Sequence, residues 1–227
     1  MGLEPDNMSG SSPEDIVNAV FGHFDPKNPL TFKDEQFNSD PILSEKALCL
    51  VYILGADTIQ FTDDRLIEKL QTVRQRISEK EIPQVIVMTK VDEACSLVRN
   101  DLRKIYSSKK IKDKMQECSD LVGVPLSYIY PVKNYHEEID TKNDIDVLVL
   151  RALTHIVKIA NDKLLRSDFN KEQPLTYKDQ HYSCDPELSD QSFCLVYVID
   201  ANIVQYTDDR LIDKLKILCQ RKGKTDP

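Results

Sequence analysis

The chain has 227 residues, of which 30 are basic and 38 acidic, and its formal net charge is −8. This acidic balance argues against non-specific binding to a nucleic-acid backbone, which needs a positive surface. Hydrophobic residues make up 41% of the chain, enough to bury a core, but no apolar run approaches the roughly 20 residues of a membrane helix. No signal peptide is recognisable at the N-terminus. We therefore expect a cytoplasmic, globular protein that binds neither nucleic acid nor membrane.

Cysteine and histidine spacing predicts neither disulfides nor a metal site. None of the six cysteines stands in a CxxC pair, and the four histidines are widely scattered along the chain. Structural zinc sites need closely spaced ligands, and cytosolic thiols stay reduced. We therefore predict free thiols and no bound metal.

The first helix is predicted just after residue 11. Ser12 can cap a helix, Pro13 suits its first turn, and Gly22 can end it. Polar and proline-rich residues 25–45 then favour a loop. The continuously apolar residues 47–54 are typical of a strand buried on both faces of a parallel sheet.

Helices and buried strands alternate in the next hundred residues. Thr62 is predicted to cap a helix with apolar residues at helical spacing, and residues 84–88 form a second buried strand. Residues 97–121 are predicted to be helical with a break near 107–108, and Gly123 can cap that helix. A third strand is expected at residues 127–132 and a last long helix around 145–159. This alternation predicts an α/β fold with helices on both faces of a mostly parallel sheet.

Part of the chain repeats itself at a constant offset. Residue 29 corresponds to 174 and residue 62 to 207, an offset of 145 in both cases. Between residues 24 and 70, about 24 of 47 positions are identical to their partners without a gap. A solenoid needs at least three short units, so this pattern indicates one long unit followed by the beginning of a second copy.

The motif Thr89-Lys90-Val91-Asp92 directly follows the second predicted strand. Ligands of open α/β sheets bind beyond the carboxyl ends of the strands. The motif resembles the guanine-specificity motif of GTPases, in which one carboxylate, here Asp92, accepts both N1–H and the exocyclic amine of guanine. The aliphatic stem of Lys90 can lie along the purine face. Thr-Lys-x-Asp after a strand is also compatible with an ordinary turn, so both readings stay open.

Two further segments resemble parts of a GTPase site. Val132, Lys133 and Asn134 follow the third predicted strand, where GTPases place a backbone amide that reads guanine O6. Gly2, in Met1-Gly2-Leu3-Glu4, resembles the tail of a DxxG motif. Together with the Asp/Asn-rich loop before Leu48 and the helix at residues 144–153, these segments make residues 1–165 similar to the interferon-induced protein 44 family.

The resemblance implies a GTPase-like, doubly wound α/β domain at residues 1–165, linked to the antiviral immune response. It also implies that the family's first strands would precede Met1, so that a partial P-loop GTPase-like sheet lacks its N-terminal strands. Residues 166–227 would then be a second, partial domain that copies about residues 24–76 as a strand and a helix. We hypothesise that the copied strand pairs with the sheet edge left bare beside residues 48–54, or that this edge recruits another chain.

The phosphate-binding half of a GTPase is missing from the sequence. A GxxxxGK[ST] loop is absent, and the Asp of DxxG would stand before Met1. Because nucleotide affinity and hydrolysis depend largely on the phosphates, we predict weak binding of GTP or GDP, no catalytic residue and no hydrolysis.

Other interpretations of the same residues stay open. The chain can be an interaction module that never binds nucleotide, with an unidentified protein partner and with Asp92 serving only the turn. It can also be a fragment of a duplicated gene, or a GTPase completed in trans by a chain that carries a P-loop.

Overall fold

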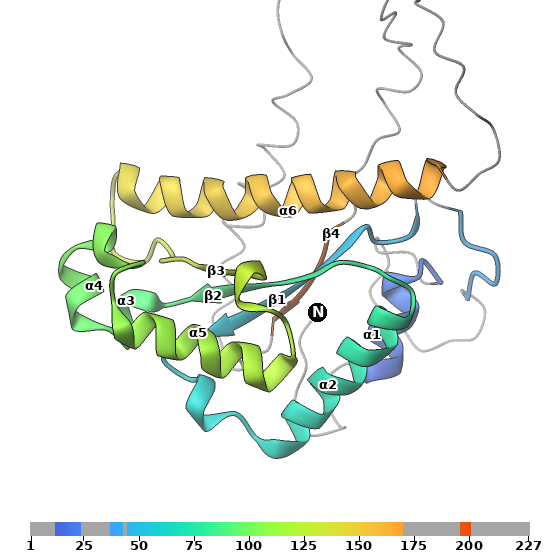
Figure 1. Ribbon diagram of the computed structural model, residues 1–227, viewed down its shortest axis with the longest axis horizontal. Helices are drawn as coiled ribbons and strands as arrows, with labels where there is room; N and C mark the ends of the chain where they lie inside the picture. The colour runs from blue at the N-terminus through green and yellow to red at the C-terminus, as the bar shows by residue number, and fades with distance from the viewer. Residues whose placement is uncertain (1–11, 24–36, 43–44, 170–195, 201–227) are drawn as a thin grey trace, which may run out of the picture.

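The computed structural model describes residues 12–23, 37–42, 45–169 and 196–200. Its strands form one parallel sheet in the order β3-β2-β1-β4 (Figure 1). The strands are β1 (Cys49–Gly55), β2 (Gln84–Thr89), β3 (Ile129–Pro131) and β4 (Val196–Asp200). The predicted α/β class with a parallel sheet is therefore confirmed.

Helices lie on both faces of this sheet. Figure 1 shows α1 (Pro13–Val20), α2 (Asp64–Glu79) and α5 (Lys109–Val122) on one side and α6 (Asn143–Phe169) along the other. The connections from β1 to β2 and from β2 to β3 advance in the same direction, so right-handed crossovers place α2 and α5 on a common face. The chain then runs through α6 on the opposite face and returns to β4 beyond β1.

The start of α1 has the predicted cap. Ser12 Oγ accepts a hydrogen bond from the Asp15 amide (3.2 Å), and Asp15 Oδ2 accepts one from the Ser12 amide (2.8 Å). This reciprocal capping box satisfies two backbone donors. After the helix, Gly22 has φ +80, and a Cβ there would lie 2.7 Å from the Glu45 carbonyl oxygen. Glycine is therefore required at this turn.

Strands β1 and β2 are buried on both faces, as their apolar runs predict. The fully buried side chains include Leu50, Tyr52, Ile86 and Met88. The Tyr52 hydroxyl donates to Gln84 Oε1 at 2.7 Å, and burial raises the pKa of Tyr52. A polar pair is tolerated in this core because each of its groups is hydrogen-bonded.

The prediction that Thr62 caps α2 is wrong. The N-cap is Asp63, whose side chain accepts from the Arg65 amide at 2.8 Å. Thr62 instead ends the short 3-10 helix η3 (Ile59–Phe61) and donates its hydroxyl to the Ile59 carbonyl at 2.8 Å. The hydroxyl is thus engaged in the preceding turn, and the cap moves one residue along the chain.

The helical region predicted at 97–121 is divided more than expected. It contains α4 (Ser96–Asn100), η4 (Leu102–Lys104) and α5, and it is preceded by α3 (Val91–Ala94). The backbone is extended at Cys95 and Asp101, and the Asp101 side chain caps a new turn by accepting from the Arg103 amide. The predicted break is confirmed, because Ser108 caps α5, and Gly123 ends α5 in the left-handed conformation.

The third strand is shorter than the predicted 127–132. Pro125 precedes the 3-10 helix η5 (Leu126–Tyr128), which delays the strand to Ile129–Pro131. The last helix, α6, is present and buries Ile145, Leu148, Ala152 and Ile156. These residues face the sheet at helical spacing, as predicted.

Strand β4 lies in parallel beside β1, at the edge where we hypothesised that the copied strand pairs. Cys49 is paired with Val196 and Val51 with Val198. Under the repeat offset of 145 residues, Val196 corresponds to Val51, so the two strands pair with a displacement of two positions. The predicted helix after β4 lies outside the described residues, and the duplication of a whole strand–helix unit stays a prediction from the sequence.

Candidate functional site at the carboxyl ends of β2 and β3

The predicted base-reading residues come together at one edge of the sheet. Thr89 ends β2, and the segment from Val132 to Asn134 directly follows β3. Met88 is paired with Pro131, and the Val132 amide donates to the Met88 carbonyl at 2.8 Å. The structure thus brings Thr89, Lys90, Asp92, Val132, Lys133 and Asn134 to neighbouring strand ends, whereas Gly2 lies outside the described residues.

Thr89 holds β2 to β1. Its hydroxyl donates to the Leu54 carbonyl at 3.4 Å, and its own carbonyl accepts from the Ala56 amide at 2.9 Å. The side chain is buried. Thr89 therefore supports the strand ends, and the partly exposed side chains beyond it are available for ligand contacts.

Lys90 has an unusual backbone conformation. Its φ is 55, in the left-handed region that non-glycine residues seldom adopt. Its ammonium lies 3.4 Å from Asp57 Oδ2, in the segment after β1. The second oxygen, Asp57 Oδ1, is buried and has no hydrogen-bond partner among the described residues. An unsatisfied buried acceptor costs about 1–3 kcal/mol, so a donor from water or a ligand would be stabilising here.

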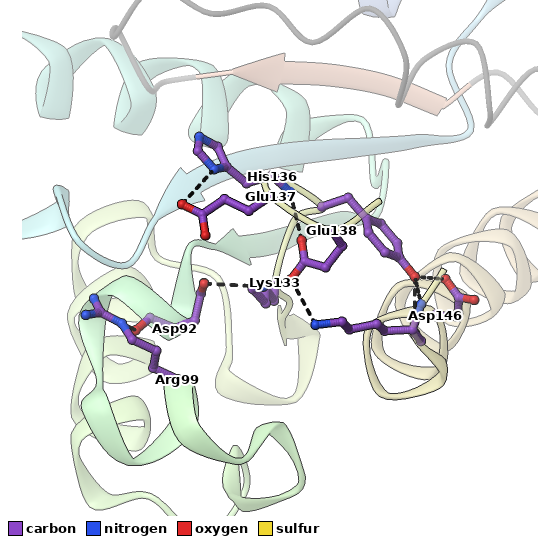
Figure 2. A network of polar contacts seen from close by, with 9 residues as sticks. Asp92, Arg99, Lys133, His136, Glu137, Glu138 and Asp146 are labelled. Carbon is purple, nitrogen blue, oxygen red and sulfur yellow. Dashed lines mark hydrogen bonds and ion pairs between the residues drawn. The ribbon is translucent and has the colours of Figure 1, made fainter. Parts of the chain in front are cut away.

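Asp92 belongs to an ionic network that also includes residues of the loop after β3 (Figure 2). Asp92 Oδ2 lies 3.8 Å from Lys133 Nζ, and these side chains are 19% and 18% exposed. Lys133 also forms an ion pair with Glu138, which is only 6% exposed. The hydrogen bond from Lys133, together with one from the His136 amide, lowers the pKa of Glu138 to about 2. Glu138 is therefore ionised at neutral pH and shares the Lys133 ammonium with Asp92.

The same loop is tied to the start of α6. The Tyr135 hydroxyl lies 2.7 Å from Asp146 Oδ1 and accepts a hydrogen bond from the Lys142 amide at 2.7 Å. Lys142 Nζ is also 3.9 Å from Glu138 Oε1. These contacts hold the residues after β3 in one conformation beside Asp92.

Arg99, in α4, contacts the main chain of the site at Asp92. Its Nε donates to the Asp92 carbonyl at 3.1 Å, as Figure 2 shows. Asp92 lies in the first turn of α3, whose N-cap is Lys90 and lacks a side-chain cap bond. The N-cap of this turn is thus Lys90 and not Asp92, whose carboxylate instead lies near the Lys133 ammonium.

The site can present the Asp92 carboxylate, with the Lys133 ammonium beside it, to a ligand with adjacent N–H donors. The sequence interpretation missed two acidic residues of this edge, Asp57 and Glu138. Both follow buried strands, as Asp92 does, and the rule that sites lie at strand ends could have singled them out. Neither belongs to a recognisable motif, which is why they were overlooked.

Other site chemistries have no support in the described part of the chain. Within it, no group of three or more metal-ligating side chains comes together, and Cys49, Cys95 and Cys118 are buried thiols that form no disulfide. No helix of the described residues is long and apolar enough to span a bilayer. For these three cysteines, the predicted free thiols are confirmed.

Comparison with known proteins identifies relatives. No model of a protein family and no solved structure matches the chain. It is 26% identical over 169 residues to interferon-induced protein 44 of Mus musculus, covering 72% of this chain and 40% of the relative. It is 24% identical over 170 residues to interferon-induced protein 44-like of Homo sapiens, covering 72% of this chain and 38% of the relative.

A third relative is interferon-induced protein 44 of Homo sapiens, 26% identical over 161 residues, with 71% of this chain and 36% of the relative covered. The chain thus spans about two fifths of the length of these relatives. These relatives confirm the resemblance to the interferon-induced protein 44 family that the motifs indicated.

Proposed function

We propose that this protein is an interferon-induced component of the immune response that reads a guanine base at Asp92 and does not hydrolyse GTP. The names of its relatives support the interferon-induced role. The guanine site rests on one observation: the partly exposed carboxylate of Asp92 lies beyond the carboxyl end of a buried parallel strand, beside the segment that follows β3.

The chemistry of guanine matches this arrangement. Its N1–H and 2-amino groups are neighbouring donors, which one carboxylate accepts together. The Val132 amide already donates to the Met88 carbonyl, so backbone amides beyond Val132 would donate to guanine O6. The stem of Lys90 can cover one face of the purine. Adenine lacks these paired donors, so Asp92 favours guanine over adenine.

Affinity is expected to be low and turnover absent. The sequence has no P-loop, and amides and a lysine of such a loop provide most of the phosphate contacts in GTPases. Hydrolysis is positioning and charge stabilisation around those phosphates. We therefore expect these 227 residues to bind without turnover.

A second candidate function is a protein-interaction module that binds no nucleotide. The observation that favours it is the Lys133 ammonium, which already lies 3.8 Å from the Asp92 carboxylate. In this case the contact between Asp92 and Lys133 joins the segments after β2 and β3 and contributes only to stability.

Titration with a fluorescent GDP analogue separates the two functions. The guanine site predicts weak, saturable binding that Asp92→Ala abolishes with little loss of stability. Asp113→Ala, at an exposed position of α5, is the matched control and should leave binding unchanged. Binding with a Kd of about 1 µM or tighter would contradict the missing phosphate contacts, and no binding by the parent chain would favour the interaction module.

A further inference from the structure

The outer face of α6 carries a stripe of exposed apolar side chains. Val147, Leu150, Val157 and Leu165 are 53%, 48%, 41% and 57% exposed. Exposed Thr154 and Asn161 lie between them along the helix. At about 100° per residue, all six positions fall within an arc of about 80°. They form one continuous line, opposite the buried residues that pack on the sheet.

The spacing of this stripe is that of a helix-pairing seam. Steps of three and four residues separate Val147, Leu150, Thr154, Val157 and Asn161. This is the a/d pattern of a coiled coil, in which a polar residue at a core position specifies register. Within the described residues no other element covers this side of α6, and Figure 1 shows the helix with its outer side turned away from the strands. Single exposed apolar residues are common, but a periodic line of them indicates a binding surface.

The charged residues beside the stripe are complementary to those of a second copy of the same helix. Asp144, Arg151 and Lys158 are exposed on the same flank, seven residues apart. When two such helices lie antiparallel with a two-fold axis near Arg151, Asp144 of one copy faces Lys158 of the other, and this pair occurs twice. The Arg151 guanidinium is 5.3 Å from the Tyr106 ring of its own chain. That cation–π contact holds it against its own chain near the axis.

We propose that α6 is a homodimer interface, in which two copies of this chain pair antiparallel along the stripe. In this arrangement Val147 packs near Val157 of the second copy and Leu150 near its Thr154. A closed two-fold interface uses the same patch on both chains, which is what a self-complementary stripe provides. The inference does not depend on the guanine site, which lies at the carboxyl ends of the strands.

Sedimentation equilibrium of the full chain tests the interface. The parent chain should show a concentration-dependent dimer, and Leu150→Glu should raise its dissociation constant by at least about tenfold. Leu97→Glu, at a similarly exposed apolar position on α4, is the control and should have no effect. A monomer at every concentration, or a dimer whose dissociation constant does not change in Leu150→Glu, would overturn the proposal.

Charge exchange tests the antiparallel register. Asp144→Lys and Lys158→Asp should each weaken the dimer, and the double variant should restore it because the two charges exchange places. Lys112→Asp, on the exposed side of α5, controls for net charge. Failure of the double variant to recover, when both single variants dissociate, would refute this pairing.

Discussion

Lys133 joins the two strand ends of the site, because its ammonium lies 3.8 Å from Asp92 Oδ2. The same ammonium is also paired with Glu138, a nearly buried carboxylate in the loop after β3. Competition between these two acidic groups determines how much of the Asp92 carboxylate is left for a ligand. The balance of charge within this network is therefore the property that the guanine proposal depends on.

The network makes stability depend on pH. The pKa of Glu138 is lowered from 4.5 to about 2, so its ionised form stabilises the fold above about pH 4.5, and this contribution is lost as pH falls toward 2. At pH 7, Glu138→Gln should reduce the free energy of unfolding by about 2 kcal/mol. Urea denaturation across this pH range should show the difference from the parent chain shrinking below about pH 4.5. Glu137→Gln, at a side chain 89% exposed, is the control, and a constant difference would contradict the assignment.

The left-handed backbone at Lys90 gives a second prediction. Both Lys90→Gly and Lys90→Ala remove the ammonium that pairs with Asp57, but only glycine adopts φ 55 without steric cost. The glycine variant should therefore be more stable than the alanine variant by about 1 kcal/mol. Thermal or urea unfolding of the two variants measures the difference, and equal stabilities would show that the backbone is not strained there.

The buried hydrogen bond between Tyr52 and Gln84 predicts a measurable loss on mutation. Tyr52→Phe keeps the ring but leaves Gln84 Oε1 without this donor. The free energy of unfolding should fall by about 1–2 kcal/mol. Tyr106→Phe, at a ring 58% exposed, should change it by less than about 0.5 kcal/mol. Equal effects of the two substitutions would mean that the buried bond contributes nothing.

Pairing of β4 with β1 predicts protection of the sheet edge. Deleting residues 170–227 should raise hydrogen exchange of the β1 amides, because one neighbouring strand is lost. Exchange in β3, which pairs with β2 on the far side of the sheet, should change less. Unchanged exchange in β1 would indicate that β4 does not pair there in solution.

The strongest sequence patterns predicted the fold well. The continuous apolar runs of β1 and β2 are buried as expected, and the signals at Ser12, Pro13 and Gly22 gave both ends of α1. These features depend on burial and on local backbone chemistry, which a few neighbouring residues determine.

Features decided by competition between neighbours were predicted less well. Thr62 and Asp63 can both cap a helix, and the preceding 3-10 turn selected Asp63. In the site, the motif identified Lys90 and Asp92. The ionic partner of Lys90, Asp57, lies 33 residues earlier in the sequence, and only the pairing of β1 with β2 brings them close. Glu138 joins the network through Lys133, which the pairing of β2 with β3 places beside Asp92.

Ligand-observed NMR with guanosine and adenosine tests base recognition at Asp92 by itself, because nucleosides carry no phosphate. We expect a saturation-transfer signal for guanosine that is lost in Asp92→Ala, and a much weaker signal for adenosine. Equal signals for both nucleosides, or a guanosine signal that survives Asp92→Ala, would contradict a guanine-reading site at this carboxylate.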